Sequence, residues 1–185
     1  MRKVFQLTVL LLFGACAAAC GQTNSITADT TESTITYHVD HFFHSVDGIS
    51  KHVTCHVYAD AATHKLSSVS IAVNVNTFDS GNSSRDNTAM DAVDASHYPE
   101  VTFQSDTVVY TSDSTLQVTG RLTFHGIAKQ FSLPVQVTHK EGGTAFDGSF
   151  GATFSGFNVT RPSLMFIPIS DKFRLTFHVV FREAF

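Results

Sequence analysis

The stretches SGNSSRD (residues 80–86), YPEVTF (98–103) and VTGRLTFHG (118–126) decide the fold of this chain. Apolar and polar residues alternate through the second and third stretches, as they do in a β-strand with one buried face. A Gly-Asn run, a proline and a His-Gly pair mark turns or a helix start beside these strands. Together the three stretches predict strands bounded by fixed turns and a short helix.

Alternation of the same kind recurs along most of the chain. The 185 residues suit one domain, and the 17 phenylalanines, with no tryptophan, accompany many Val, Ile, Thr and Ser residues, which favour strands over helices. Eight windows place apolar side chains on one face: 35–39, 53–57, 69–75, 101–103, 116–124, 131–137, 146–154 and 173–181. We therefore predict an all-β fold of about eight antiparallel strands, with a turn at 45–48.

One segment interrupts this pattern. Between Arg85 and Tyr98, alanines, a methionine and a valine follow a helical spacing, and Asp86 or Asn87 could cap the helix. Pro99 then favours an extended chain. The sequence thus predicts one short helix, placed where it could plug or cover one end of a barrel and gate access to it.

The N-terminus has the pattern of an export signal. Residues 1–19 contain a positive start, an apolar run too short to span a bilayer, and small residues before Cys20. A lipoprotein signal peptidase or the ordinary enzyme could cut before Cys20, leaving either a lipidated cysteine or a free terminal thiol. We predict a signal peptide at 1–19, a lipid anchor and flexible tether at 20–32, a domain at 33–185, and a membrane-anchored location in the periplasm.

Charge and cysteine content restrict the partners. Without Arg2 and Lys3 the remaining chain has 10 basic and 16 acidic residues, a formal charge of −6, so nucleic acid is not an expected partner. No basic cluster follows Cys20, so membrane attachment would depend on acyl chains. Cys55 is then the only cysteine of the domain, which excludes an internal disulfide. Its apolar surroundings in the sequence indicate a small core residue rather than a nucleophile.

The inner face of the predicted strands carries Phe, Val, Leu, Ile, Tyr, Cys and Gly, and almost no charge. Eight strands enclose just enough room for side chains or for one small apolar ligand. A packed core and an apolar binding cavity both need such a lining. Composition therefore leaves both open, with ordinary core packing the commoner outcome.

The segments at 75–86, 97–105 and 118–129 resemble the YceI-like polyisoprenoid-binding family, and the resemblance extends from about Thr34 to Phe181. It implies an extended, lipocalin-like barrel of eight antiparallel strands whose apolar pore holds an isoprenoid or another long-chain lipid. The candidate lining residues on the inner face are Tyr37, Ile71, Val73, Phe103, Leu122, Phe124, Phe150, Phe154, Leu175 and Phe177.

Two polar residues are candidates for the pore mouth, and each has a second interpretation. His41 could hydrogen-bond a polar ligand head, or it could be a histidine at the edge of the core that binds backbone. Arg85 could bind a headgroup, or it could pair with a neighbouring carboxylate or carbonyl groups beside a helix that Asp86 caps.

Catalysis and metal binding lack a recognisable pattern. His38, His41 and His44 are three residues apart, but a strand turns His41 away from the other two, so we predict no metal site. Ser, His and Asp are abundant without forming a nucleophile motif, and we predict a non-enzymatic protein that needs no cofactor.

The leading hypothesis is a protein that sequesters or carries a long-chain lipid, such as a polyisoprenoid, an isoprenoid quinone or a fatty-acid-like molecule. It would act as a monomer or homodimer. The alternative is a structural or interaction module of the cell envelope whose barrel is filled by its own side chains.

Overall fold

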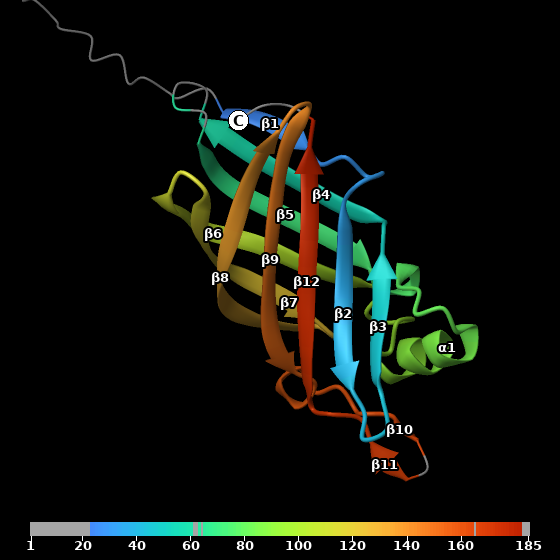
Figure 1. Cartoon of the computed structure of the whole chain (residues 1–185). Coiled ribbons are helices and arrows are strands. Elements are labelled where there is room, and N and C mark those ends of the chain that lie inside the picture. Colours follow the sequence, from blue (N-terminus) through green and yellow to red (C-terminus); the bar gives the residue numbers. More distant parts are fainter. Residues whose placement is uncertain (1–22, 61–62, 64, 165, 183–185) are drawn as a thin grey trace, which may run out of the picture.

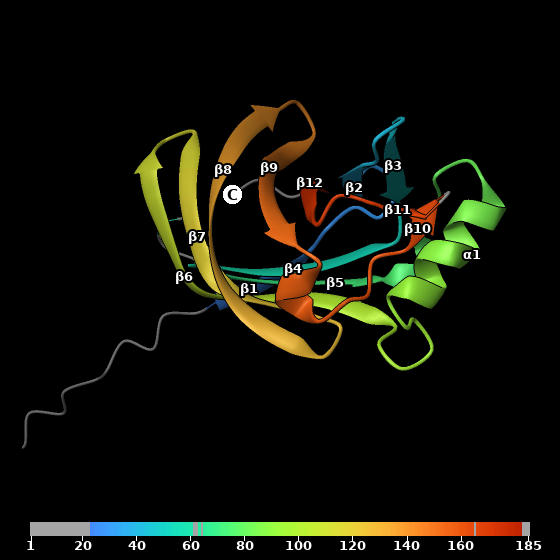
Figure 2. The same cartoon turned by 90° about the horizontal axis from the view of Figure 1, so that it is seen from below.

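The computed structural model describes residues 23–60, 63, 65–164 and 166–182. Within these ranges ten antiparallel strands form one curled sheet in the order β1-β4-β5-β6-β7-β8-β9-β12-β2-β3, and β10 pairs with β11 in a separate hairpin (Figures 1 and 2). The helix α1 spans Ser83–Ala92, and two short 3-10 helices are η1 (Val75–Thr77) and η2 (Ser155–Phe157). The strands are β1 (Thr23–Thr27), β2 (Thr34–Asp40), β3 (Ser45–Ser50), β4 (Val53–Asp60), β5 (Leu66–Asn74), β6 (Glu100–Ser112), β7 (Thr115–Phe124), β8 (Ile127–Lys140), β9 (Gly143–Thr153), β10 (Ser163–Leu164), β11 (Ile167–Pro168) and β12 (Lys172–Phe181).

The prediction of an all-β, antiparallel fold with one short helix is confirmed, but the predicted count of eight strands is not. Each of the eight alternating windows coincides with a strand of the main sheet, except that Val75 lies in η1 and Phe154 follows β9. Strands β1 and β3 are additional edge strands. The sheet curls into a half-barrel with α1 beside the β3 edge (Figure 2). The predicted turn at 45–48 lies inside β3, and the chain turns earlier, where His41 N–H donates to the His44 carbonyl at 2.9 Å.

Strand β1 occupies part of the segment predicted to be a flexible tether. It pairs with β4 from Thr23 opposite Asp60 to Thr27 opposite His56, and the Ile26 side chain is buried. This strand was not predicted because Ile26 is its one apolar residue, so the segment shows no alternation. The ordered domain therefore begins before Ser33, whereas the predicted signal peptide and Cys20 lie outside the described residues.

Two glycines of the third opening stretch shape the sheet. Residues His125 and Gly126 both have positive φ, 49° and 71°, which is the conformation of a two-residue turn joining neighbouring antiparallel strands, here β7 and β8. Gly120 lies against β6 so closely that a Cβ there would be 2.4 Å from the Gln104 carbonyl oxygen. The Thr-Gly and His-Gly pairs are thus required by backbone geometry.

The segment between β1 and β2 fastens the end of the half-barrel opposite α1. Ala28 N–H donates to the Cys55 carbonyl of β4 at 2.9 Å, and Asp29 N–H donates to the Val180 carbonyl of β12 at 2.7 Å. Ser33 is fully buried, and its hydroxyl accepts from Val180 N–H. The Asp29 carboxylate accepts hydrogen bonds from Thr31 and from Arg182, and these partners hold its pKa below its usual range. This segment ties two distant strands of the sheet together.

We expect Gly120→Ala to destabilise the protein by about 1–3 kcal/mol, because its methyl group meets backbone that cannot move aside. Gly151→Ala is the matched control, since a Cβ at that strand position meets only the Phe173 carbonyl oxygen, at an ordinary 3.8 Å. Urea unfolding of both variants checks the prediction. Equal stabilities for the two would contradict it.

The Asp29 carboxylate makes stability depend on acid pH. Its folded pKa lies below the unfolded value of about 3.9, so it stabilises the fold above that pH and this contribution is lost as the pH falls through the folded pKa. We expect Asp29→Asn to lower the melting temperature at neutral pH, with a difference from wild type that shrinks below about pH 4. Circular dichroism melts over this range, with Asp113→Asn in an exposed turn as control, provide the measurement. A difference that did not change with pH would refute the assignment.

Candidate functional site

An apolar cavity of about 630 Å³ runs along the inside of the half-barrel. At one end its wall includes Leu66 and Leu116, which are almost completely buried. At the other end its lining includes Ser84 and Thr88 of α1, which are exposed to solvent. The cavity therefore opens beside α1 and is packed at the far end.

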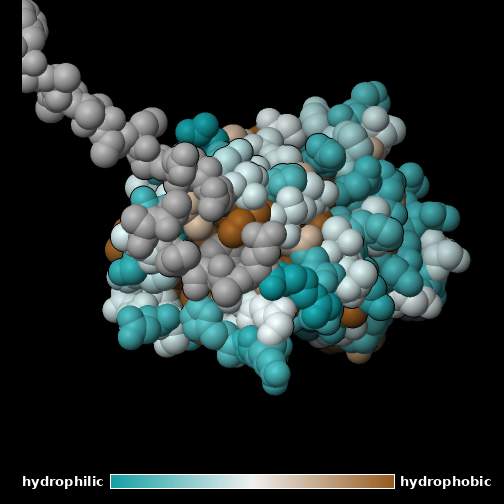
Figure 3. Space-filling model, turned by 90° about the horizontal axis from the view of Figure 1, so that it is seen from above, coloured by the Kyte–Doolittle hydropathy of each residue, from teal (hydrophilic) through white to brown (hydrophobic). Residues whose placement is uncertain are grey.

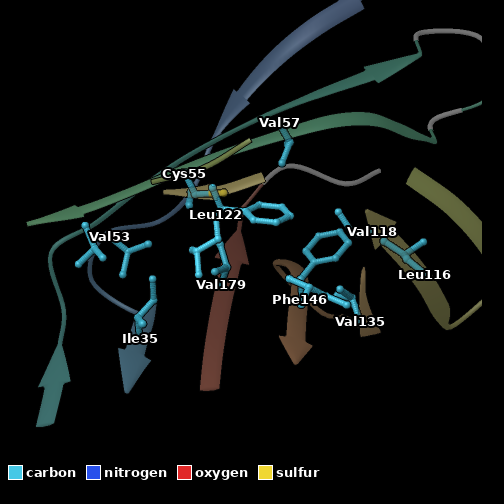
Figure 4. Close-up of a cluster of buried hydrophobic side chains, with 14 of the residues drawn as sticks. Ile35, Val53, Cys55, Val57, Leu116, Val118, Leu122, Val135, Phe146 and Val179 are labelled. Carbon is cyan, nitrogen blue, oxygen red and sulfur yellow. The ribbon is translucent and has the colours of Figure 1, made fainter. Parts of the chain in front are cut away.

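The packed part of the interior draws side chains from opposite walls of the half-barrel. Figure 4 shows Cys55 of β4, Leu122 of β7 and Val179 of β12 pointing toward one another, with further apolar side chains around them. Each of these three side chains is at most 3% exposed. The protein thus combines a densely packed core with a hollow region.

All ten candidate lining residues lie on the cavity wall: Tyr37, Ile71, Val73, Phe103, Leu122, Phe124, Phe150, Phe154, Leu175 and Phe177. Several of them remain only half-buried although they point inward, among them Ile71, Phe150 and Leu175. An inward side chain keeps accessible surface when it faces empty space rather than another side chain. The structure thus brings all ten residues together on one apolar wall, and their role in binding a ligand stays a prediction.

Aromatic rings on the wall lie across glycines of the neighbouring strand. Tyr37 of β2 is opposite Gly48 of β3, and Phe177 of β12 is opposite Gly148 of β9. A Cβ at either glycine would be 2.3 Å from the facing ring. Because glycine has no Cβ, each ring can lie flat against the sheet instead of projecting into the cavity.

His41 lies at the mouth and binds backbone. It lines the cavity, and its Nε2 is 3.1 Å from the Ile167 carbonyl oxygen, so the protonated tautomer donates to it. This contact connects the β2–β3 turn to the β10–β11 hairpin. Both interpretations of His41 remain compatible with its position, since its ring is at once a backbone ligand and part of the mouth.

Arg85 also lines the mouth and binds a carbonyl group, as its second interpretation predicted, whereas the predicted helix cap is wrong. Its Nε donates to the Ser80 hydroxyl at 2.8 Å, and its Nη2 donates to the Ser80 carbonyl at 2.7 Å. Asn82, not Asp86, caps α1 by accepting from Arg85 N–H. Asp86 lies within the first turn and binds the Ser80 hydroxyl and amide. No ion pair within the described part of the chain includes Arg85.

Tyr37 lies on the cavity wall and adds its hydroxyl group to the polar side chains of Ser80, Arg85 and Asp86. Burial raises the pKa of Tyr37, and the nearby Asp86 carboxylate adds to the shift. The phenol therefore stays protonated and keeps a hydroxyl at the edge of the apolar lining. Polar groups that line the cavity are thus concentrated on the side of the mouth.

Some lining residues could not be identified from alternation. Phe78, Val93, Val159 and Ile169 line the cavity from loops and from the segment after α1, where the period of two does not apply. Their apolar character was the one available signal, and it does not distinguish the cavity from ordinary packing.

The remaining candidates for chemistry have structural environments. Burial raises the pKa of Cys55 to about 12, so its thiol stays protonated. His38 and His178 lie on the outer face and bind Asp47 and Asp147 at 2.6 Å. The described residues contain no group of three or more His, Cys, Asp or Glu side chains that could hold a metal ion. Among the same residues, no helix has the length and apolar character needed to cross a membrane.

Comparison with known proteins identifies relatives of this chain. It is 33% identical over 103 residues to a UPF0312 protein of Pseudomonas putida, an alignment that covers 55% of this chain and 51% of that protein. It is 36% identical over 72 residues to the UPF0312 protein VPA0850 of Vibrio parahaemolyticus, covering 38% of each chain. The matched region therefore spans about half or less of the length of these relatives.

Solved structures share the fold. Burkholderia cenocepacia BcnA superposes with a TM-score of 0.73 and 26% identity, covering 83% of this chain and 98% of BcnA. A polyisoprenoid binding domain from Saccharophagus degradans gives a TM-score of 0.66 at 12% identity, covering 85% of this chain and 97% of that domain, which is a likeness of fold alone.

The family model described as the YceI-like domain matches residues 26–181 of this chain, a range that begins in β1 and ends with β12. The match includes the helix α1 and every strand that lines the cavity. The chain therefore belongs to the YceI-like domain family.

Proposed function

We propose that the protein binds a long-chain apolar lipid in this cavity, without catalysis, to sequester or transport it. The ligand would be a polyisoprenoid, an isoprenoid quinone or a fatty-acid-like chain. The cavity itself carries the proposal: about 630 Å³, open at one end and lined almost entirely by apolar side chains. Its volume lies in the range of about 300–1,000 Å³ that is usual for ligand sites.

The apolar lining favours a hydrocarbon over water. Water in such a space finds few hydrogen-bond partners, and even an engineered apolar cavity of about 150 Å³ stays dry and binds benzene. Each methylene group moved from water into the cavity contributes about 0.8 kcal/mol before the cost of ordering the chain. A long tail can therefore bind tightly without specific polar contacts.

The mouth offers a place for a polar lipid head. The Arg85 guanidinium is held in place by Ser80, and His41 lines the mouth from the β2–β3 turn. Because Arg85 takes part in no ion pair among the described residues, its charge is available to a hydroxyl, carbonyl or phosphate oxygen. We infer that these two residues orient the head while the wall holds the tail.

The alternative of a self-filled barrel receives no support from the interior. Its premise is a core without a cavity, whereas Ile71, Phe150 and Leu175 face open space. The non-catalytic part of the proposal is supported by the buried, protonated thiol of Cys55 and by the structural hydrogen bonds of the polar groups at the mouth. We also propose export to the periplasm and attachment to a membrane through lipidated Cys20, on the basis of residues 1–20.

The proposal is tested by native mass spectrometry of the protein purified from a bacterial envelope, with organic extraction of the bound material. We expect one long-chain lipid or quinone per protein molecule. A protein that emerges empty and also takes up no added long-chain lipid would refute the proposal.

Filling the cavity should abolish this binding. We expect Leu175→Trp, which projects a larger side chain from β12 into the cavity, to reduce bound lipid by at least about tenfold while the protein stays folded. Thr176→Trp places the same side chain at the adjacent, outward-facing position and is the control. Mass spectrometry of both variants, with circular dichroism to verify folding, decides the outcome. Equal lipid content would show that the ligand lies elsewhere.

A smaller change should act through the aromatic wall. In Gly148→Ala the new methyl group forces the Phe177 ring away from the sheet and into the cavity. Relative to wild type, we expect the affinity for long lipids to fall more than the affinity for short ones, because the displaced ring shortens the open channel. A series of fatty acids of increasing length, measured by calorimetry against wild type, checks this expectation. The same loss of affinity at every length would contradict it.

A further inference from the structure

Two hairpin tips beside the cavity mouth expose large apolar side chains. In the β2–β3 turn, Phe42 is 80% exposed and Phe43 is 57% exposed. In the β10–β11 hairpin, Phe166 is 99% exposed and Ile167 is 37% exposed. The His41–Ile167 hydrogen bond joins the two tips, which together form a protruding apolar rim.

The backbone of Phe166 makes its exposure more unusual. It lies in the turn between the paired residues Leu164 and Ile167 and has a φ of 65°. Glycine and asparagine are favoured at such a position, and a bulky residue there is strained. The turn would form more easily with a small polar residue, so folding does not explain the phenylalanine.

The apolar rim is continuous with the cavity. His41 and His44 from the first tip, and Pro162 and Ser163 from the second, line the cavity mouth. Figure 2 shows α1, β3 and the β10–β11 hairpin gathered at this end. The opposite end, seen in Figure 3, shows mainly hydrophilic residues around a small hydrophobic area near its centre. The exposed aromatic residues are therefore concentrated where a ligand would enter.

Charged side chains near the rim are of both signs and form no basic cluster among the described residues. Asp40 and Asp47 both contact His38, and Asp40 also accepts from the Ser45 hydroxyl. Arg161 lies 3.9 Å from Asp171. A rim that lacks a basic cluster and carries protruding aromatic side chains suits the interface of a bilayer, where apolar side chains insert among the acyl chains without a need for anionic lipids.

We propose that the β2–β3 and β10–β11 tips insert into the surface of a lipid bilayer, so that the cavity mouth opens against the acyl chains. This inference rests on the proposed function, since it gives a lipid cargo a route that avoids water. The lipid surface is the partner, and lipid moves between bilayer and cavity while the tips are inserted.

The absence of tryptophan from the chain allows a direct test. In the full-length chain carrying Cys20→Ser, so that no acyl anchor contributes, Phe166→Trp provides a single emitting residue at the tip. We expect phosphatidylcholine vesicles to shift its emission to the blue, and bromine atoms on their acyl chains to quench it. This response should persist at about 1 M salt, where the Debye length is about 3 Å. No response, or one that needs anionic lipid and disappears with salt, would overturn the proposal.

A pair of variants measures the contribution of the tips. In the same Cys20→Ser background, Phe42→Ser with Phe166→Asn removes the two most exposed aromatic side chains of the rim and places a favoured residue in the strained turn. Co-sedimentation with phosphatidylcholine vesicles should weaken by about tenfold or more for each phenylalanine. The control is Tyr58→Ser with Val109→Ser, which removes exposed apolar side chains near the other end of the sheet. Equal weakening in both pairs would overturn the proposal.

Binding of farnesol supplied in water separates this proposal from the proposed function. If the Phe42→Ser, Phe166→Asn protein still binds farnesol but no longer takes up lipid from vesicles, docking and cavity binding are both supported. If wild type fails to bind farnesol or any vesicle lipid, the proposed function fails, while tryptophan insertion and co-sedimentation still decide whether the tips dock. Uptake from vesicles by the tip variant at the wild-type rate would overturn the docking role.

Discussion

The hollow interior depends on aromatic rings that lie over glycines. Tyr37 over Gly48 and Phe177 over Gly148 are pairs on neighbouring strands, and in each pair the glycine leaves the space that the ring occupies. A Cβ at either glycine would turn the ring inward. Aromatic coverage of strand glycines also shields the exposed backbone, which offsets the conformational cost of glycine in a sheet. The same constraint therefore supports both the wall and the cavity it encloses.

Residues that build the fold and residues that would hold a ligand are largely different. Gly120, Gly126 and Asn82 set a close approach, a hairpin turn and a helix cap, and none needs a ligand to explain it. The cavity wall is apolar and offers few hydrogen bonds, so the length and width of the cavity determine which ligands fit. Arg85 has both roles. Its hydrogen bonds to Ser80 are part of the fold, and they hold the guanidinium at the mouth, where a ligand head would lie. Relatives that keep the turns can thus differ in what they bind.

The sequence predicted the wall well and the rim poorly, for physical reasons. Alternation at a period of two reports which face of a strand is buried, and it located Phe103, Leu122 and Leu175 on the cavity. It could not show that the interior is hollow, because a packed core needs the same residues. Strand β3 was not predicted because Gly48 and the polar residues before it are typical of a turn. The exposure of Phe42 and Phe166 was not predicted. Turns are recognised by small polar residues, and a phenylalanine in a turn therefore does not mark the turn or its exposure to solvent.

The position of β1 restricts how an anchored protein could use its mouth. Thr23 pairs with Asp60, at the end of the sheet away from α1, and only two residues separate it from Cys20. Such a connection spans about 10 Å at most, whereas the 10 residues of β12, which runs from the mouth to the other end of the sheet, extend about 33 Å. If Cys20 carries lipid as we propose, the anchor holds the apolar tips away from its own membrane. The bilayer that the tips meet is then a different surface from the anchoring one, and exchange between two membranes follows from the geometry more naturally than storage at one.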